Sequence, residues 1–143
     1  MSGLAGILSG RHEPGVFRWQ AKFEVTSVAH AAERAGWRMG HLDTWQSDTK
    51  SDFLGRIGEA LGFPSYYGHN FDALADCLAD VGKDGVGTVL LWDGWGQFAR
   101  HDSDAFEIAI RALKARASEA RPAPFAALLR GEGPDLGRIR SID

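Results

Sequence analysis

Residues 86–92 read Val-Gly-Thr-Val-Leu-Leu-Trp, an apolar run that lies between Gly85 and an Asp-Gly turn. A continuous apolar run of this length, with turn residues at both ends, is typical of a central strand that is buried on both faces. A second apolar run covers 125–129, and a helical pattern over 102–119 separates the two. Strands that alternate with helices predict an α/β fold with a small parallel sheet.

Outward from these runs, the sequence predicts further helices and one more strand. The expected helices cover 27–35, 51–61, 70–81 and 102–119, with a short helical turn at 96–98 and a strand at 37–42. Ser27 can cap the first helix, Ser51 or Asp48 the second, and Asn70 the third. We therefore expect a sheet flanked by helices around a single core, with 27–35 as an N-terminal helical extension.

The two ends of the chain lack the periodic patterns of the middle. Residues 1–15 contain Gly10 and a Pro-Gly pair, and residues 131–143 are rich in glycine and charge. We predict a flexible lead-in over 1–15, one domain over 16–130 and a loose tail over 131–143. Trimming both ends should then leave the thermal stability nearly unchanged.

The net charge of −3 is concentrated in one segment. Residues 69–84 hold four aspartates and one lysine, which gives −3, while the rest of the chain holds 15 acids and 15 bases. A local excess of this sign favours a basic partner and argues against a nucleic acid.

The cysteine content and the N-terminal residues predict the cellular compartment of the protein. Cys77 is the only cysteine, so the chain can form no intramolecular disulfide, which favours a reducing compartment. The first residues have no basic segment before their short apolar run, and no stretch approaches the roughly 20 apolar residues of a membrane helix. We expect a cytoplasmic protein that is not bound to a membrane and is a monomer when free.

An enzymatic function has little support. The five histidines are scattered without metal-ligand spacing, and there is no nucleophile motif, so we expect no catalytic site, no metal and no cofactor. His69 lies three residues before Asp72 and could resemble an acid–base pair, but such pairs are common on helices. Trp92 and Trp95 could form a platform for a sugar or a base, although the strand before them favours packing in the core.

Three aspartates, Asp72, Asp76 and Asp80, lie on one face of the helix predicted after Asn70, and we call this face the acid stripe. The other face carries the apolar residues Phe71, Leu74, Leu78 and Val81. Like charges four residues apart repel, and Asp is a poor helix former, so helix stability does not explain the stripe.

The acid stripe is either a solvated face or a docking surface for a cationic site. The loop before it, with Tyr66, Tyr67 and Gly68, favours docking, because aromatic rings are common interface anchors. We expect one of the two tyrosines to lie in the core and the other to be available for binding.

Residues 64–78 read Pro-Ser-Tyr-Tyr-Gly-His-Asn-Phe-Asp-Ala-Leu-Ala-Asp-Cys-Leu. This stretch closely resembles the signature of the barstar family, in which a Tyr-Tyr-Gly loop leads into Asn-Leu-Asp-Ala-Leu-x-Asp-Cys-Leu. A match of this length and mixed character is far more specific than a short glycine motif. A weaker resemblance extends over 37–130.

The resemblance implies three parallel strands flanked by helices, and inhibition of an extracellular guanyl-type ribonuclease of basic character. By position, Tyr66 would be an aromatic contact, Asp72 a charge contact, and Asp76 the acid that enters the phosphate site of the enzyme. The expected partner-binding set also includes Gly68, His69, Ala73 and, outside the signature, Asp80. The resemblance thus implies that the chain is an antitoxin or immunity protein. The alternative is an acidic protein-interaction module that binds another basic toxin or a cellular protein.

Three positions depart from the family pattern. The tryptophan between the two acids is Ala75, and the acid before the asparagine is His69. A further interface acid on a later helix has only Glu107 as a loose counterpart.

Overall fold

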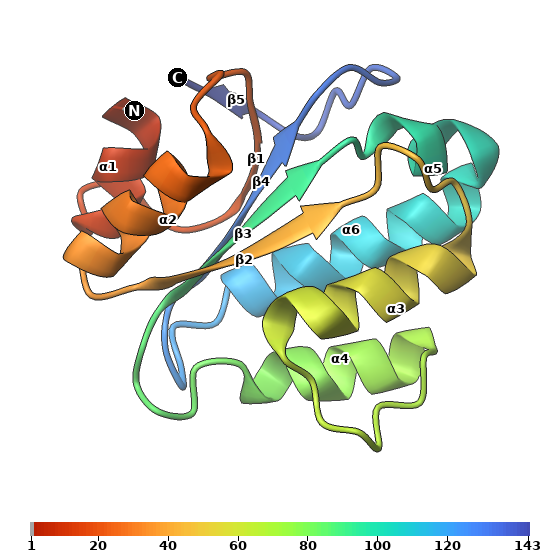
Figure 1. The fold of residues 1–143 in the computed structure, drawn as a ribbon, viewed down its shortest axis with the longest axis horizontal. Coiled ribbons are helices and arrows are strands. Elements are labelled where there is room, and N and C mark those ends of the chain that lie inside the picture. The colour runs from red at the N-terminus through yellow and green to blue at the C-terminus, as the bar shows by residue number, and fades with distance from the viewer. Residues whose placement is uncertain (1) are drawn as a thin grey trace.

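The computed structural model describes residues 2–143 and contains one sheet of five parallel strands, in the order β2-β3-β4-β1-β5 (Figure 1). The strands are β1 Val16–Trp19, β2 Arg38–Asp43, β3 Thr88–Asp93, β4 Phe125–Arg130 and β5 Ser141–Ile142. The helices are α1 Ser2–Leu8, α2 Val25–Arg34, α3 Lys50–Leu61, α4 Phe71–Asp80, α5 Gly96–His101 and α6 Ser103–Ala117.

The expectation of a three-stranded sheet is therefore wrong. The structure has β2, β3 and β4 side by side, and β1 and β5 extend the sheet beyond β4. The two additional strands have only four and two residues, which is too short for a periodic pattern to mark them in the sequence. The predicted central strand is confirmed, because β3 is buried along its whole length and pairs with both β2 and β4.

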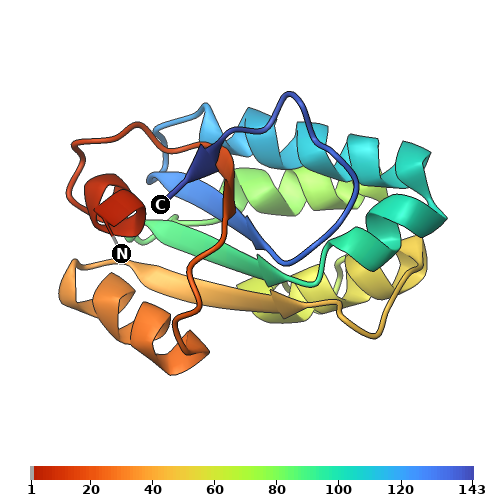
Figure 2. The same ribbon diagram turned by 90° about the horizontal axis from the view of Figure 1, so that it is seen from above.

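Two hydrophobic clusters fill the two faces of the sheet. On one face, α3, α4, α5 and α6 pack over alternate residues such as Leu90 and Trp92. On the other face, α1 and α2 pack over the residues between them, such as Val89 and Leu91. Figure 2 shows these helices on the two sides of the strands. The alternation is that of strands with both faces buried.

The N-terminal residues are part of the fold rather than a flexible lead-in. Leu4 and Ile7 of α1 are buried in the second cluster, and the N–H of Gly3 donates to the carbonyl of Asp143 at 2.8 Å. The tail returns to the sheet as β5, so the two ends lie side by side (Figures 1 and 2). The division of the chain at 15/16 and 130/131 stays a prediction.

The helix caps agree with the sequence in part. Asn70 caps α4 as predicted, since its side chain accepts from the N–H of Ala73 at 2.8 Å. Thr49, rather than Ser51 or Asp48, caps α3 and accepts from the N–H of Asp52 at 3.1 Å. The first predicted helix begins two residues earlier than expected, at Val25.

Candidate protein-binding site

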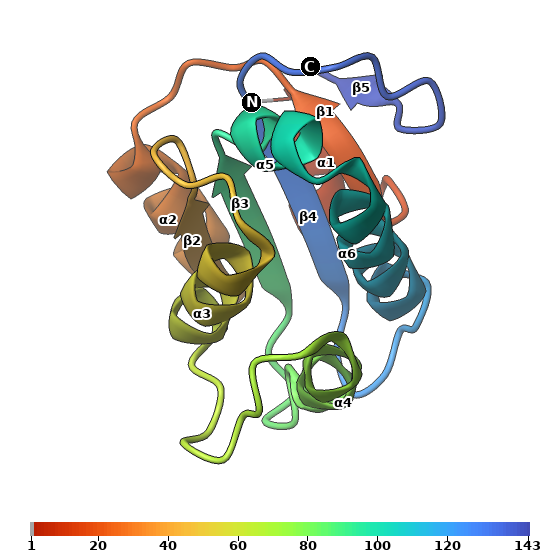
Figure 3. The same cartoon turned by 90° about the vertical axis from the view of Figure 1, so that its right-hand side faces the viewer.

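Helix α4 packs between α3 and α6, with its inner face in the core (Figure 3). Leu74, Cys77 and Leu78 are buried, which confirms the predicted apolar face, and Cys77 packs there as a small hydrophobe. Burial comes first among the causes that raise the pKa of Cys77, followed by the charges of Asp80 and Asp76. The outer face of α4 is therefore the face that carries the aspartates.

Arg116 of α6 holds the C-terminal end of α4, a role that the sequence did not predict. Its Nε donates to the carbonyl of Leu78 at 2.8 Å, and its Nη2 donates to those of Val81 and Ala123 at 2.8 and 2.7 Å. Burial of this guanidinium lowers its pKa, although Glu119 acts in the opposite direction. A cation at this end also complements the helix dipole.

All three aspartates of the acid stripe are exposed, as predicted. Asp80 forms an i,i+3 ion pair with Lys83 at 3.3 Å, whereas Asp72 and Asp76 form no ion pair within residues 2–143. The exposed residues between the acids are Ala75 and Ala79, which are small. A partner can therefore approach the helix closely between Asp72 and Asp76.

The remaining acid of the negative segment, Asp84, is also paired. Arg38 donates to its two oxygens at 2.6 and 3.3 Å on the protein surface. This hydrogen bond, followed by one from the backbone of Val86, lowers the pKa of Asp84. The unpaired negative charge of the segment is thus concentrated at Asp72 and Asp76, in the N-terminal half of α4.

The two tyrosines of the loop have opposite environments, as predicted. Tyr66 is 80% exposed, whereas Tyr67 is 7% exposed and its ring packs edge-on against Phe63 at 4.9 Å. A Cβ at Gly58 of α3 would lie 2.8 Å from the Tyr67 ring, so this glycine makes room for it. Burial, followed by the charge of Cys77, raises the pKa of Tyr67 to about 12. Tyr67 thus anchors the loop that presents Tyr66.

Of the other predicted contact residues, Gly68 and His69 lie between Tyr66 and the acid stripe, and Ala73 lies on α4 between Asp72 and Asp76. Gly68 and His69 are exposed, and the Gly68 carbonyl accepts from Nδ2 of Asn70 at 3.3 Å. Ala73 is half-buried and packs against the core, so its side chain offers little to a partner.

Glu107 does not join this cluster. Arg138 of the tail donates to Glu107 at 3.1 Å, and both residues line a cavity between α6 and residues 135–139. The loose counterpart proposed from the sequence is therefore engaged elsewhere.

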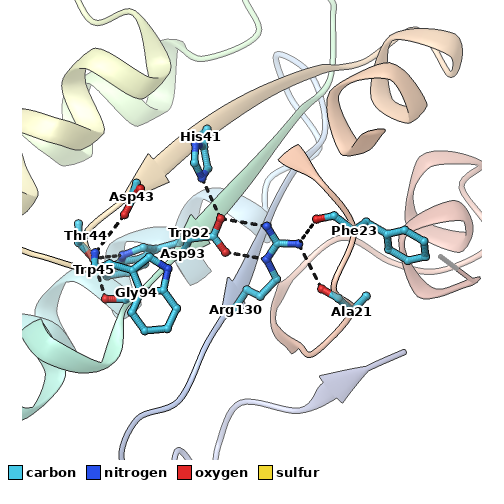
Figure 4. Close-up of polar contacts among 10 residues, drawn as sticks. All are labelled: Ala21, Phe23, His41, Asp43, Thr44, Trp45, Trp92, Asp93, Gly94 and Arg130. Carbon is cyan, nitrogen blue, oxygen red and sulfur yellow. Dashed lines mark hydrogen bonds and ion pairs between the residues drawn. The ribbon is translucent and has the colours of Figure 1, made fainter. Parts of the chain in front are cut away.

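A second polar cluster lies at the carboxyl ends of the strands, on the face that α1 and α2 cover (Figure 4). Arg130 donates to both oxygens of Asp93 at 2.6 and 3.0 Å, and Nε2 of His41 lies 2.8 Å from Asp93 Oδ2. Arg130 also donates to the carbonyls of Ala21 and Phe23 at 3.1 and 2.7 Å. The cluster ties the ends of β2, β3 and β4 to the loop after β1.

For the two tryptophans near this cluster, the sequence left open a stacking platform or packing in the core. Trp92 and Trp95 are fully buried, so they pack in the core and form no stacking platform. The Trp92 indole donates to Thr44 Oγ1 at 2.8 Å, and this hydroxyl donates to the Gly94 carbonyl at 3.0 Å. Trp45, in the neighbouring loop, is the half-exposed ring at this end.

Residues 2–143 contain no group of three or more His, Cys, Asp or Glu side chains placed to hold a metal ion. Across the same residues, no helix combines the length and apolar character that a membrane span requires.

The profile of the family described as "Barstar (barnase inhibitor)" matches residues 37–130. The chain belongs to the barstar family. The match includes the Tyr66 loop and α4, together with β2, β3 and β4, while β1 and β5 lie outside it. These two strands, from the N- and C-terminal residues, bring the sheet to five.

A solved structure gives a further likeness in fold. The ORC2 protein of Aeropyrum pernix, in its ADPNP-ADP complexes, superposes with a TM-score of 0.64 at 16% sequence identity. The superposition covers 92% of this chain and 38% of that chain, so this chain spans well under half of its length. A comparison with curated proteins gives no match.

Proposed function

We propose that this chain is an inhibitor, of the antitoxin or immunity type, of a basic guanyl-type ribonuclease. One observation carries the proposal. Asp72 and Asp76 are exposed and without an ion-pair partner in residues 2–143, on the helix that lies within the barstar match and beside an 80% exposed Tyr66. Unpaired acids on a rigid helix next to an exposed aromatic ring suit a cationic cleft.

The mechanism follows from what a ribonuclease must hold. Its active site binds a phosphate and is therefore rich in cationic side chains. A carboxylate on the helix can occupy the phosphate position through charge-assisted hydrogen bonds, and Tyr66 can cover the adjacent surface. The cap at Asn70 and the clamp of Arg116 fix α4 before binding, which reduces the entropy lost on association.

Inhibition by occlusion requires no catalytic group and no cofactor from this chain. Members of the family are inhibitors, which supports a non-enzymatic role. We further propose that the chain acts in the cytoplasm as a monomer and protects the cell from a secreted enzyme. Cys77, the one cysteine of the sequence, is buried and forms no disulfide, which suits such a compartment.

The experiment is a titration of barnase, the enzyme in the family description, with the full chain while RNA cleavage is followed. The proposal predicts stoichiometric loss of cleavage, and an association rate that falls steeply between low and physiological salt. Undiminished cleavage at a large excess of the chain would contradict it. Binding that leaves cleavage intact would instead favour the acidic interaction module.

A further inference from the structure

His69 has an unusual backbone conformation. It is the one non-glycine residue within residues 2–143 that has a positive φ, at 52°. Residues other than glycine adopt this region rarely, although His, Asn and Asp do so more often than the rest. Such conformations persist only where the surrounding contacts impose them, and they are common at functional sites.

The contacts that fix His69 come from the loop and from α3. Its ring lies on that of Tyr67, with centroids 4.7 Å apart and planes tilted by 34°. Tyr67 is itself buried, so it provides a rigid base. A Cβ at Gly55 of α3 would lie 3.9 Å from the His69 ring, which places the imidazole beside α3. The ring is thus held in place while the residue stays exposed between Tyr66 and Asp72.

The charged groups near His69 are acidic on α4 and mixed on α3. The titratable side chains of the loop, α3 and α4 are those of Tyr66, Tyr67, Lys50, Asp52, Arg56, Glu59, Asp72, Asp76, Cys77 and Asp80. His69 forms no ion pair with any described residue of the chain. Its charge state therefore changes the net charge of the docking surface directly.

We propose that His69 is a specificity-determining contact that makes ribonuclease binding depend on pH, an inference that rests on the proposed function. With His69 neutral, Asp72 and Asp76 give the docking surface a charge of −2, and protonation of the imidazole reduces it to −1. A cationic cleft that covers the ring disfavours its protonated form. Binding and protonation of His69 therefore oppose each other, and affinity falls as the pH falls.

The test compares the dissociation constants of barnase with the wild-type chain and with His69→Asn at pH 7.5, 6.5 and 5.5. Asn is neutral over this range and tolerates a positive φ. Titration of the enzyme's own groups affects both proteins equally, so the ratio of the two constants isolates His69. We expect the wild-type chain to lose several-fold more affinity than His69→Asn between pH 7.5 and 5.5, because only the wild-type chain must release a proton from residue 69 on binding.

Two further variants make the result decisive. His30→Asn changes an exposed histidine on α2 and should keep the wild-type pH response. His69→Gly retains the positive φ without strain and should behave as His69→Asn does. A ratio that stays constant with pH overturns the role of His69 while leaving the inhibitor function standing. Failure of the wild-type chain to bind barnase at pH 7.5 overturns both.

Discussion

At the scale of single residues, Asp93 shows how a buried charge is tolerated in this fold. Its side chain is 10% exposed and that of Arg130 is 15% exposed. Burial alone would raise the pKa of Asp93, but hydrogen bonds from Arg130 and His41 and their charges lower it below its ordinary value. A carboxyl group of this kind stabilises the folded state in its ionised form.

Asp93→Asn should therefore destabilise the protein at neutral pH by about 3–5 kcal/mol, the range for removing one partner of a buried pair. Because the folded pKa is lowered, the contribution is present above the unfolded value of about 4 and is lost as the pH falls through the folded pKa. Urea unfolding of both proteins from pH 7 to pH 3 measures this, and the difference should shrink below about pH 4. Asp84→Asn, at an exposed pair, is the control and should change little. Equal effects of the two changes would contradict this role of Asp93.

Residues whose role follows from local pattern were predictable, whereas long-range partners were not. The exposure of Asp72 and Asp76 follows from helical periodicity, and the burial of one tyrosine follows from the loop sequence. Arg116 donates to carbonyls that lie 35 and 38 positions before it in the sequence, and Arg130 donates to carbonyls more than 100 positions before it. A single sequence does not pair donors and acceptors over such separations.

At the scale of elements, α4 shows the closest agreement between sequence and structure. Its predicted cap, inner face and outer face are all present, because capping and periodicity are local properties. The sequence did not predict β1, with four residues, or β5, with two, because strands this short show no periodic pattern. Their pairing depends on β4 and on each other, which are distant in the sequence.

The cap of α4 gives a prediction at this scale. Asn70→Ala removes the acceptor for the Ala73 N–H and should destabilise the protein by about 1 kcal/mol. Asn70→Asp retains an acceptor and should keep the wild-type stability, because Asp and Asn cap equally well. Chemical denaturation of the three proteins checks this. A loss of stability in Asn70→Asp as large as that in Asn70→Ala would exclude capping as the cause.

At the scale of the whole molecule, the five-stranded sheet makes both ends part of the core. Residues 1–36 lie outside the barstar match, yet α1 and α2 cover one face of the sheet. The sequence did not indicate this for α1, because its seven residues contain only three large apolar side chains and two glycines. The burial of Leu4 and Ile7 reverses the expectation that trimming would be harmless.

Leu4→Ala should therefore destabilise the protein by about 2–5 kcal/mol, as expected for a large-to-small change in a core. Glu13→Ala, at an exposed position of the same N-terminal segment, serves as the control and should have little effect. Thermal unfolding of the two variants beside the wild-type chain is the measurement. If Leu4→Ala melts at the wild-type temperature, α1 does not contribute to the core in solution.

The proposed function depends on α4 as the docking element, and Asp76 tests this role most directly. Asp76 is exposed, unpaired within residues 2–143 and one turn beyond Asp72, whereas Asp80 is paired with Lys83. The measurement is calorimetric binding of barnase to Asp76→Ala and Asp80→Ala, with a thermal melt of each. Asp76→Ala should lose about 2–5 kcal/mol of binding energy, as when one partner of a buried charge pair is truncated, and Asp80→Ala much less. Asp76→Ala should melt no earlier than the wild-type chain, because Ala is the better helix former and a repulsion is removed. Asp80→Ala also loses its exposed ion pair with Lys83 and should melt close to the wild-type temperature. Wild-type affinity in Asp76→Ala, or normal binding with early unfolding, would contradict the docking of α4 in a ribonuclease active site.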